Sequence, residues 1–230
     1  MQTKLDKAGI VYIVKAIFQD IIAAVLFFAS AGTLRWVRGW VYFIMYVFST
    51  TIGVFYLSKY NTELLNERTK DRDNTEKWDK ILLKLYIALA FFIIYVVAGM
   101  DIRYRWSSIS IIYMYPALVI IILSSCLMVW AMKENANFEA TSRIQSDRIQ
   151  NVCQFGPYSI IRHPGYLAII LWAVAIPFVF GSLYMMIPSF IISAIIVIRT
   201  YLEDRMLKER LSGYMEYSNR TKYRLIPYIW

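Results

Sequence analysis

The residue types best suited to chemistry in this chain gather in two polar clusters of its C-terminal part. The segment Arg162-His163-Pro164 contains the only histidine and opens a long apolar run. A second cluster, around Arg199 and Glu203, lies where the next apolar run ends. An arginine presents paired donors that match a carboxylate, and a histidine or glutamate can accept a proton. We interpret the two clusters as parts of one candidate site.

The composition predicts an integral membrane protein built from α-helices. Hydrophobic residues make up 59% of the 230 residues and charged residues 18%, below the quarter that is typical of soluble domains. Because a span needs about 20 apolar residues, we predict about six transmembrane helices. Their expected ranges are residues 9–32, 39–58, 81–100, 109–131, 164–180 and 183–201. We treat 1–230 as a single membrane domain, in which 1–131 holds four spans and 132–230 holds a catalytic loop, a helical hairpin and a tail.

The last two predicted spans are expected to bring the two clusters together. Only Gly181-Ser182 separates them, so they form a helical hairpin with Pro164 near the start of its first arm. A hairpin returns the chain to the membrane face from which it started. Pro177 and Pro188 are expected to kink or shorten the two arms.

The basic residues predict the orientation of the chain in the membrane. If both termini share a side, the loops on that side carry 19 Lys and Arg residues and the opposite loops carry 4. Because basic loops stay in the cytoplasm, we expect both termini and both polar clusters to face the cytoplasm, across the inner membrane if the source is prokaryotic. Membrane lipids are then partners, and nucleic acid is not expected despite the net charge of +9. The sequence does not indicate the oligomeric state.

Other polar features receive structural interpretations. Residues 59–80 contain six basic and six acidic residues and are interpreted as a solvated or interfacial helix. Asp20, inside the first predicted span, is expected to pair with Lys15 or a neighbouring helix, and we assign it no chemistry. Cys126 and Cys153 have the spacing of neither a disulfide framework nor a metal site, and no metal is predicted.

The order of motifs from residue 137 onward resembles the isoprenylcysteine carboxyl methyltransferase family. The motifs are Asn137-Phe138, Gln145, Gly156-Pro157-Tyr158, Arg162-His163-Pro164-Gly165-Tyr166, Arg199, Glu203-Asp204, Gly213-Tyr214 and Glu216-Tyr217. The resemblance covers the last 95 residues or so, by count from residue 137. It implies transfer of a methyl group from S-adenosylmethionine, held in a cytoplasm-facing pocket, to a lipophilic or prenylated substrate that enters from the bilayer.

The resemblance also implies roles for individual residues. Catalysis falls on Arg199, Glu203 and Arg162. Cofactor binding falls on Gln145, Tyr158, His163, Pro164, Tyr166, Glu203 and Asp204. Many relatives have a second glutamate at the position of Asp204, so the chain departs from the family there.

The methyl acceptor remains open at this stage. A carboxylate acceptor is already ionised near neutral pH, so it needs placement by Arg199 or Arg162 and no base. A thiol or amine must lose a proton, and His163 or Glu203 are the candidate bases. Isoprenylcysteine is the acceptor that the family name implies.

Each polar residue also has a structural interpretation. His163 can cap the hairpin, the arginines can bind lipid phosphates, and Glu203 and Asp204 can pair with Arg199 or Lys208 on their own helix. The tyrosines can belong to an interfacial belt. Two other functions stay open: an NADPH-dependent reductase resembling the sterol reductases, on the residues from Arg199 to Glu203-Asp204 and in the tail 222–230, and a non-catalytic lipid-binding protein. A transporter is less favoured because broken helices and mid-span polar residues are sparse.

Overall fold

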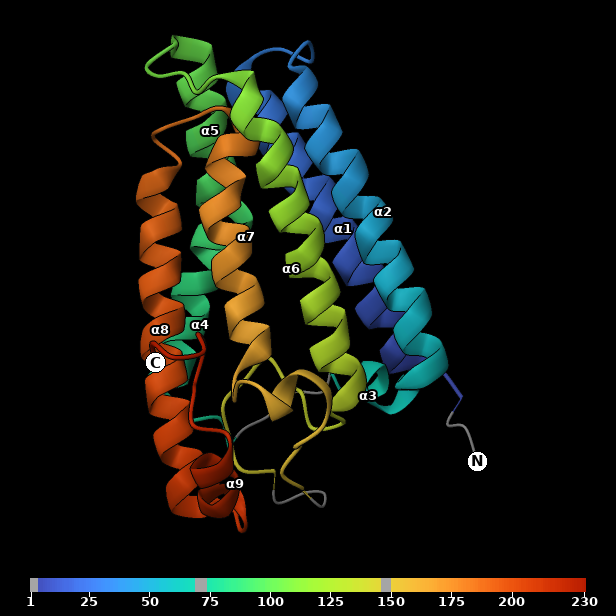
Figure 1. The fold of residues 1–230 in the computed structure, drawn as a ribbon. Coiled ribbons are helices and arrows are strands. Elements are labelled where there is room, and N and C mark those ends of the chain that lie inside the picture. The colour runs from blue at the N-terminus through green and yellow to red at the C-terminus, as the bar shows by residue number, and fades with distance from the viewer. Residues whose placement is uncertain (1–3, 69–73, 146–149) are drawn as a thin grey trace.

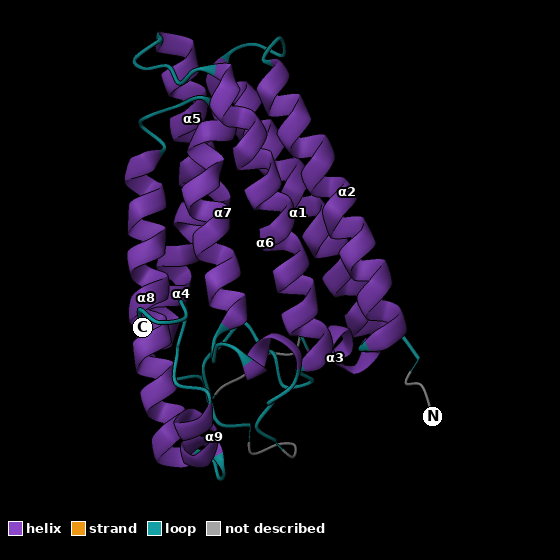
Figure 2. Ribbon diagram, in the orientation of Figure 1, coloured by secondary structure: helices purple, strands orange, loops and turns teal. Residues whose placement is uncertain are grey.

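The chain is helical throughout the part that the structure describes. The structure is a computed structural model, and it describes residues 4–68, 74–145 and 150–230. Within these ranges it contains α-helices, 3₁₀ and π turns and loops, and no β-strand (Figure 2). The predicted all-α membrane fold is confirmed.

Within the described residues, five helical stretches are long and apolar enough to cross a membrane, and a shorter apolar helix accompanies them. The long stretches are α1 (Lys7–Ala31), α2 (Val37–Tyr60), Lys77–Tyr104, Ile111–Glu134 and α8 (Met186–Arg210), and the shorter helix is α7 (Pro164–Phe180). The stretch Lys77–Tyr104 consists of α4 (Lys77–Ala88), a π-helical turn (Leu89–Ile93) and α5 (Ile94–Tyr104). The stretch Ile111–Glu134 consists of a 3₁₀ turn (Ile111–Tyr113) and α6 (Met114–Glu134).

The predicted helical hairpin is present and its ends have local causes. Pro164 occupies the first turn of α7, where a missing N–H costs no hydrogen bond. Gly181 ends α7 with φ +81°, a left-handed conformation that favours glycine. Pro188 lies in the first turn of α8, where its missing N–H costs no hydrogen bond, whereas Pro177 lies inside α7 and the helix ends three residues after it. The second arm continues to Arg210, nine residues beyond the predicted end.

Aromatic side chains fill the centre of the bundle. Phe27 of α1 meets Phe180 of α7 at a centroid distance of 4.7 Å, edge to face. In the same core, Trp172 donates from Nε1 to the Tyr42 hydroxyl (3.0 Å), which in turn bonds to the Tyr95 hydroxyl (2.9 Å). These hydrogen bonds are buried and join α2, α5 and α7, so they hold the three helices in a fixed register.

The bundle carries its irregular structure at one end, which we call the pocket end. There α1, α4 and α7 begin and α2, α6 and α8 finish (Figure 1). Between and beyond these helix ends lie α3 (Thr62–Glu67), a 3₁₀ turn (Gly156–Ser159) and α9 (Tyr214–Arg220), with α9 against the lower end of α8. At the opposite end Asp101 binds the hydroxyls of Ser107 and Ser182 and so ties the loop after α5 to the hairpin turn.

The polar segment 59–80 differs from its interpretation as a solvated helix. Residues 69–73 lie outside the described part, but α3 buries Leu64 and Leu65 completely. Asp79, in the first turn of α4, is also fully buried. A charged residue in the interior needs a partner, so Asp79 leads directly to the candidate site.

Candidate active site

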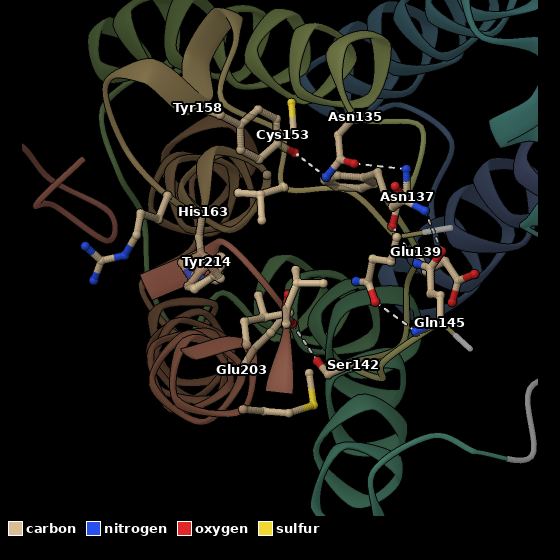
Figure 3. A pocket seen from close by; sticks show the side chains of 18 of the residues that line it. Asn135, Asn137, Glu139, Ser142, Gln145, Cys153, Tyr158, His163, Glu203 and Tyr214 are labelled. Carbon is tan, nitrogen blue, oxygen red and sulfur yellow. Dashed lines mark hydrogen bonds between the residues drawn. The ribbon is translucent and has the colours of Figure 1, made fainter. Parts of the chain in front are cut away.

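A polar cavity opens at the pocket end between α7, α8, α9 and the loop after α6. Its walls come from the chain around residues 135–145 and 150–153, the turn before α7, the first residues of α7, the end of α8 and the start of α9. Figure 3 shows Glu203, Ser142, Gln145, Asn135, Tyr158, His163 and Tyr214 placed around it. The enclosed space is about 110 Å³.

Glu203 and Glu139 are carboxylates that line this cavity, and Glu139 is paired with Arg143. Glu203 lies on the part of α8 that extends past the predicted span, and its Oε2 accepts bonds of 2.5 Å from both the Ser142 and the Tyr166 hydroxyl. The two donors come from different elements, the loop after α6 and α7. Because both hold the same oxygen, the carboxylate has a fixed position while Oε1 keeps no partner among the described residues.

Behind Glu203 lies a buried ion pair between Arg199 and Asp79. The guanidinium donates from Nε to Asp79 Oδ1 at 2.8 Å and from Nη2 to the Ala140 carbonyl at 2.8 Å. Both side chains are at most 2% exposed. Asp79 also accepts from the backbone N–H of Ser142 (2.8 Å), so the ion pair and Glu203 share Ser142 as a common neighbour.

Arg199 therefore stands one layer away from the cavity. Its guanidinium carbon lies 5.3 Å from the centroid of the Tyr166 ring, and Tyr166 lines the cavity while Arg199 does not. Nη1 of Arg199 has no hydrogen-bond partner within the described residues. Arg199 is therefore a fixed cation whose remaining N–H groups can donate to an anionic group.

Asp204 does not line the cavity, and several cations surround its carboxylate. It accepts from Arg162 Nε at 2.7 Å and Arg224 Nε at 2.9 Å, with Lys208 Nζ at 3.3 Å. The contact with Lys208 is the same-helix pair expected from the sequence. Arg162 also donates from Nη1 to the carbonyls of residues 221 and 222, both at 2.7 Å. This network fastens the C-terminal segment to the start of α7.

His163 connects the Asp204 network with the cavity. Its Nε2 lies 3.6 Å from Asp204 Oδ1, and its ring stacks on Tyr166 at a centroid distance of 5.7 Å and an angle of 8°. His163 occupies the N-cap position of α7, but its side chain makes no capping bond. Tyr214 donates to Asp204 Oδ1 at 3.1 Å, and burial and the charge of Asp204 raise the pKa of Tyr214. Its hydroxyl therefore remains a donor.

Amide side chains form the opposite wall. Asn137 Nδ2 donates to Gln145 Oε1 and Gln145 Nε2 donates to the Asn137 carbonyl, each at 2.8 Å. Asn135 reaches the Tyr158 hydroxyl at 3.4 Å. Burial raises the pKa of the neighbouring Cys153 thiol, which remains protonated and is a poor nucleophile. This wall offers hydrogen bonds and an aromatic ring, and its charged residues, Glu139 and Arg143, form an ion pair with each other at 2.7 Å.

The structure brings most of the sequence-predicted site residues together. Those that line the cavity are Gln145, Tyr158, Arg162, His163, Pro164, Tyr166 and Glu203. Arg199 and Asp204 do not line it, because Arg199 is screened by Tyr166 and the carboxylate of Asp204 is enclosed by its partners, including Arg162 and Arg224. The expected partner of Arg199 also differs, since it pairs with Asp79 rather than with Glu203.

The same geometry tests whether the tyrosines form an interfacial belt and whether the arginines bind lipid phosphates. Tyr158, Tyr214 and Tyr217 are at most 6% exposed, so an interfacial belt does not describe them. Arg162 and Arg199 are buried in ion pairs and are not placed to bind lipid phosphates. Arg205 is exposed and, among the described residues, pairs only with Glu209, so the interpretation of Arg205 as a lipid anchor stays open.

The family comparison covers the heart of this region. Residues 117–209, about two fifths of the chain, match the model of the isoprenylcysteine carboxyl methyltransferase (ICMT) family. The family resemblance is confirmed for this segment. The ICMT segment runs from α6 through the cavity loop and the hairpin to the end of α8, and it supports a membrane methyltransferase in general. No curated protein matches the chain at a significant level.

Several residues of the site lie outside the ICMT segment or carried no sequence signal. Asp79 precedes the segment by almost 40 residues, and Tyr214, Tyr217 and Arg224 follow it. Ser142 lies inside the segment, but no motif in the loop after α6 distinguishes it from other serines. Asp79 had one usable signal, an acidic residue directly before an apolar span at the end of the bundle where α7 starts.

Proposed function

We propose that the chain is an S-adenosylmethionine-dependent methyltransferase that acts on a lipophilic acceptor, most simply a carboxylate such as that of isoprenylcysteine. The observation that supports this most is the position of Glu203. It belongs to the ICMT segment, and it lies at the wall of a polar cavity at the bundle end, opposite neutral amides and a tyrosine. Methyl transfer needs few reactive side chains and mainly a cavity that holds two partners in line.

The residues of the cavity fit this cofactor. The carboxylate of Glu203 suits the amino group of the cofactor, while Asn135, Asn137 and Gln145 offer donors and acceptors to its polar groups. The ring of Tyr158 suits a sulfonium or a purine. When bound, the cofactor supplies a methyl group that is activated by the positive sulfur. The enclosed 110 Å³ is below the roughly 300 Å³ of small-molecule pockets, so we expect the polar wall to move outward on binding.

The chain's own residues place the acceptor and exclude water. For a carboxylate acceptor, Arg199 with its unpartnered Nη1 is the cation that would orient the group, and the Tyr166 ring has to move aside for this contact. No proton has to be removed in that case. For an amine or thiol acceptor, the unpartnered Oε1 of Glu203 would take the proton.

The test is calorimetric titration of the detergent-purified protein with S-adenosylhomocysteine and, separately, with NADPH. We expect saturable binding of the first only. Glu203→Gln should weaken it by about tenfold or more, because a charge-assisted hydrogen bond contributes about 1.5–3 kcal/mol. The matched control is Glu209→Gln, on the same helix but exposed and paired only with Arg205, which should bind as wild type does.

The other outcomes identify the competing functions. Binding of NADPH alone would contradict the proposal and favour a reductase. Binding of neither ligand would favour a non-catalytic lipid-binding protein. Equal affinities in the Glu203→Gln and Glu209→Gln variants would remove Glu203 from the cofactor site.

A further inference from the structure

A second cavity lies inside the membrane-spanning part of the bundle, apart from the candidate active site. It has a volume of about 250 Å³ and lies between α1, α2, α6, α7 and the π-helical turn. Apolar side chains form most of its surface, but Ser49, Thr50 and Ser124 add hydroxyl groups to it. The π-helical turn contributes Phe91, and such turns are frequent at functional sites.

The cavity contains a buried carboxyl group that the fold does not satisfy. Asp20 lies near the middle of α1, is 8% exposed and lines the cavity. Its Oδ2 is completely buried and has no hydrogen-bond partner in the described part of the chain, although the Thr50 side chain hydrogen-bonds to the carboxyl group. The residues that line the cavity include no Lys, Arg or His, so the expected pairing with Lys15 is not found there. A buried carboxyl oxygen without a partner is costly, so Oδ2 is the atom at which a further donor can bind.

An apolar groove leads from the bilayer side to the same carboxyl group. The groove follows α1 and α2, has a volume of about 970 Å³ and is also lined by Asp20. Its side chains include Val25, Ile44 and Phe48, which are 60–66% exposed on the outside of the bundle. Asp20 is thus common to a groove open to lipid and a cavity with hydroxyl groups (helices α1 and α2 in Figure 1).

We propose that Asp20 is the polar anchor of an intramembrane binding site for an amphiphile that carries a hydrogen-bond donor, a hydroxyl or an amine. The apolar body of the ligand lies in the groove between α1 and α2, and its donor bonds to Asp20 Oδ2. Asp20 and the groove lie outside the ICMT segment, whereas α6 and α7 of that segment form part of the inner cavity wall. Binding at Asp20 does not depend on methyl transfer. A plain hydrocarbon chain would fill the groove but leave the carboxyl unsatisfied, so the site selects for the donor.

The experiment is photo-crosslinking of the full chain in phosphatidylcholine vesicles, read by mass spectrometry of peptides from residues 7–60. The probes are a diazirine-bearing long-chain alcohol, the matching primary amine and the methyl ether of the alcohol, which lacks a donor. We expect the ether to label these peptides about fivefold less than the alcohol or amine, since one hydrogen bond contributes about 1 kcal/mol. This comparison uses the wild-type protein and needs no variant.

Two variants test the role of the carboxyl group. Asp20→Leu should reduce labelling by the alcohol and the amine to the level seen with the ether. Asp20→Asn should retain labelling by the alcohol and lose any preference for the amine over the alcohol. The control, Ser189→Ala, removes another buried unpartnered polar atom that lies away from both cavities and should label as wild type does. Equal labelling by alcohol, amine and ether in the wild type, or unchanged labelling in a folded Asp20→Leu protein, would overturn the proposal. Titration with S-adenosylhomocysteine should be unaffected by Asp20→Leu, so the two proposals can fail separately.

Discussion

At the scale of single residues, the arrangement of the candidate active site depends on a charge that no ligand would touch. The Asp79 carboxylate accepts hydrogen bonds from the Arg199 guanidinium and from the backbone N–H of Ser142. The hydroxyl of Ser142 in turn donates to Glu203. Each of these contacts joins elements that are distant in sequence. Asp79 is therefore a positioning residue for both the cation and the carboxylate of the site.

Asp79→Asn should uncouple these groups. The substitution leaves the Arg199 guanidinium buried without its counter-charge, which costs about 3 kcal/mol and should lower the unfolding temperature in detergent by about 10 °C. Affinity for S-adenosylhomocysteine should decrease as well, because Ser142 loses a fixed neighbour. Scanning fluorimetry and calorimetry measure the two effects.

Glu76→Gln is the matched control for this prediction. Glu76 lies three residues before Asp79 and also pairs with an arginine of α8, Arg210, at 2.7 Å, but at the protein surface. Exposed pairs contribute less than about 1 kcal/mol, so this variant should unfold close to the wild-type temperature. If both variants behave alike, the buried pair does not organise the site.

At the scale of elements, the C-terminal segment is a structural part of the active-site region. The backbone N–H groups of Arg162 and His163 donate to the carbonyls of residues 223 and 224, both at 2.9 Å. Arg224 reaches Asp204 and lies over the Trp230 ring, with its guanidinium carbon 4.9 Å from the centroid. The segment thereby fixes the turn from which α7 begins.

Deletion of residues 222–230 should therefore weaken binding at the cavity. The turn at Arg162 and His163 loses several backbone and side-chain hydrogen bonds, each contributing about 1 kcal/mol, so we expect S-adenosylhomocysteine affinity to fall by tenfold or more. Calorimetry on the truncated protein checks this. A double substitution, Tyr228→Ala with Ile229→Ala, alters exposed side chains of the same segment and keeps its backbone, so it should bind as wild type does. Wild-type affinity after truncation would show that the segment is dispensable.

The elements themselves were largely predictable, whereas their contacts were not. Long apolar runs predict helices because backbone groups inside a membrane must be hydrogen-bonded to one another. Pro164 and Gly181 mark a helix start and a helix end. The cavity residues from Gln145 to Tyr166 were found because they are close together in sequence and carry family motifs. Asp79 pairs across 120 residues with Arg199, and a hydropathy pattern contains no information about such a pairing.

The length of α8 is a second feature that the hydropathy pattern does not predict. Hydropathy ends a span where the lipid ends, near residue 201, but the helix continues because Asp204 has Lys208 one turn away and cations from other elements around it. Glu203 is thereby held on a rigid helix rather than on a loop.

At the scale of the whole molecule, buried tyrosines at the pocket end link stability to alkaline pH. Burial is the main cause that raises the pKa of Tyr158, Tyr214 and Tyr217, and all three lie outside the membrane spans. Their hydroxyls stay protonated in the folded protein, while those of the unfolded chain ionise above about pH 10. The unfolded state then binds fewer protons than the folded state, so this contribution to stability is complete below pH 10 and declines as the pH rises further.

Tyr214→Phe should reduce this alkaline sensitivity. Each such tyrosine lowers the free energy of unfolding by about 1.4 kcal/mol per pH unit above pH 10, and the variant removes one of them. The measurement is the unfolding temperature in detergent between pH 8 and pH 11, compared as a slope so that other titrating groups cancel. Tyr228→Phe, at a side chain that is 89% exposed, should retain the wild-type slope. Identical slopes in the wild type and the Tyr214→Phe variant would mean that Tyr214 ionises in the folded protein, and that water reaches the cavity wall beside Asp204.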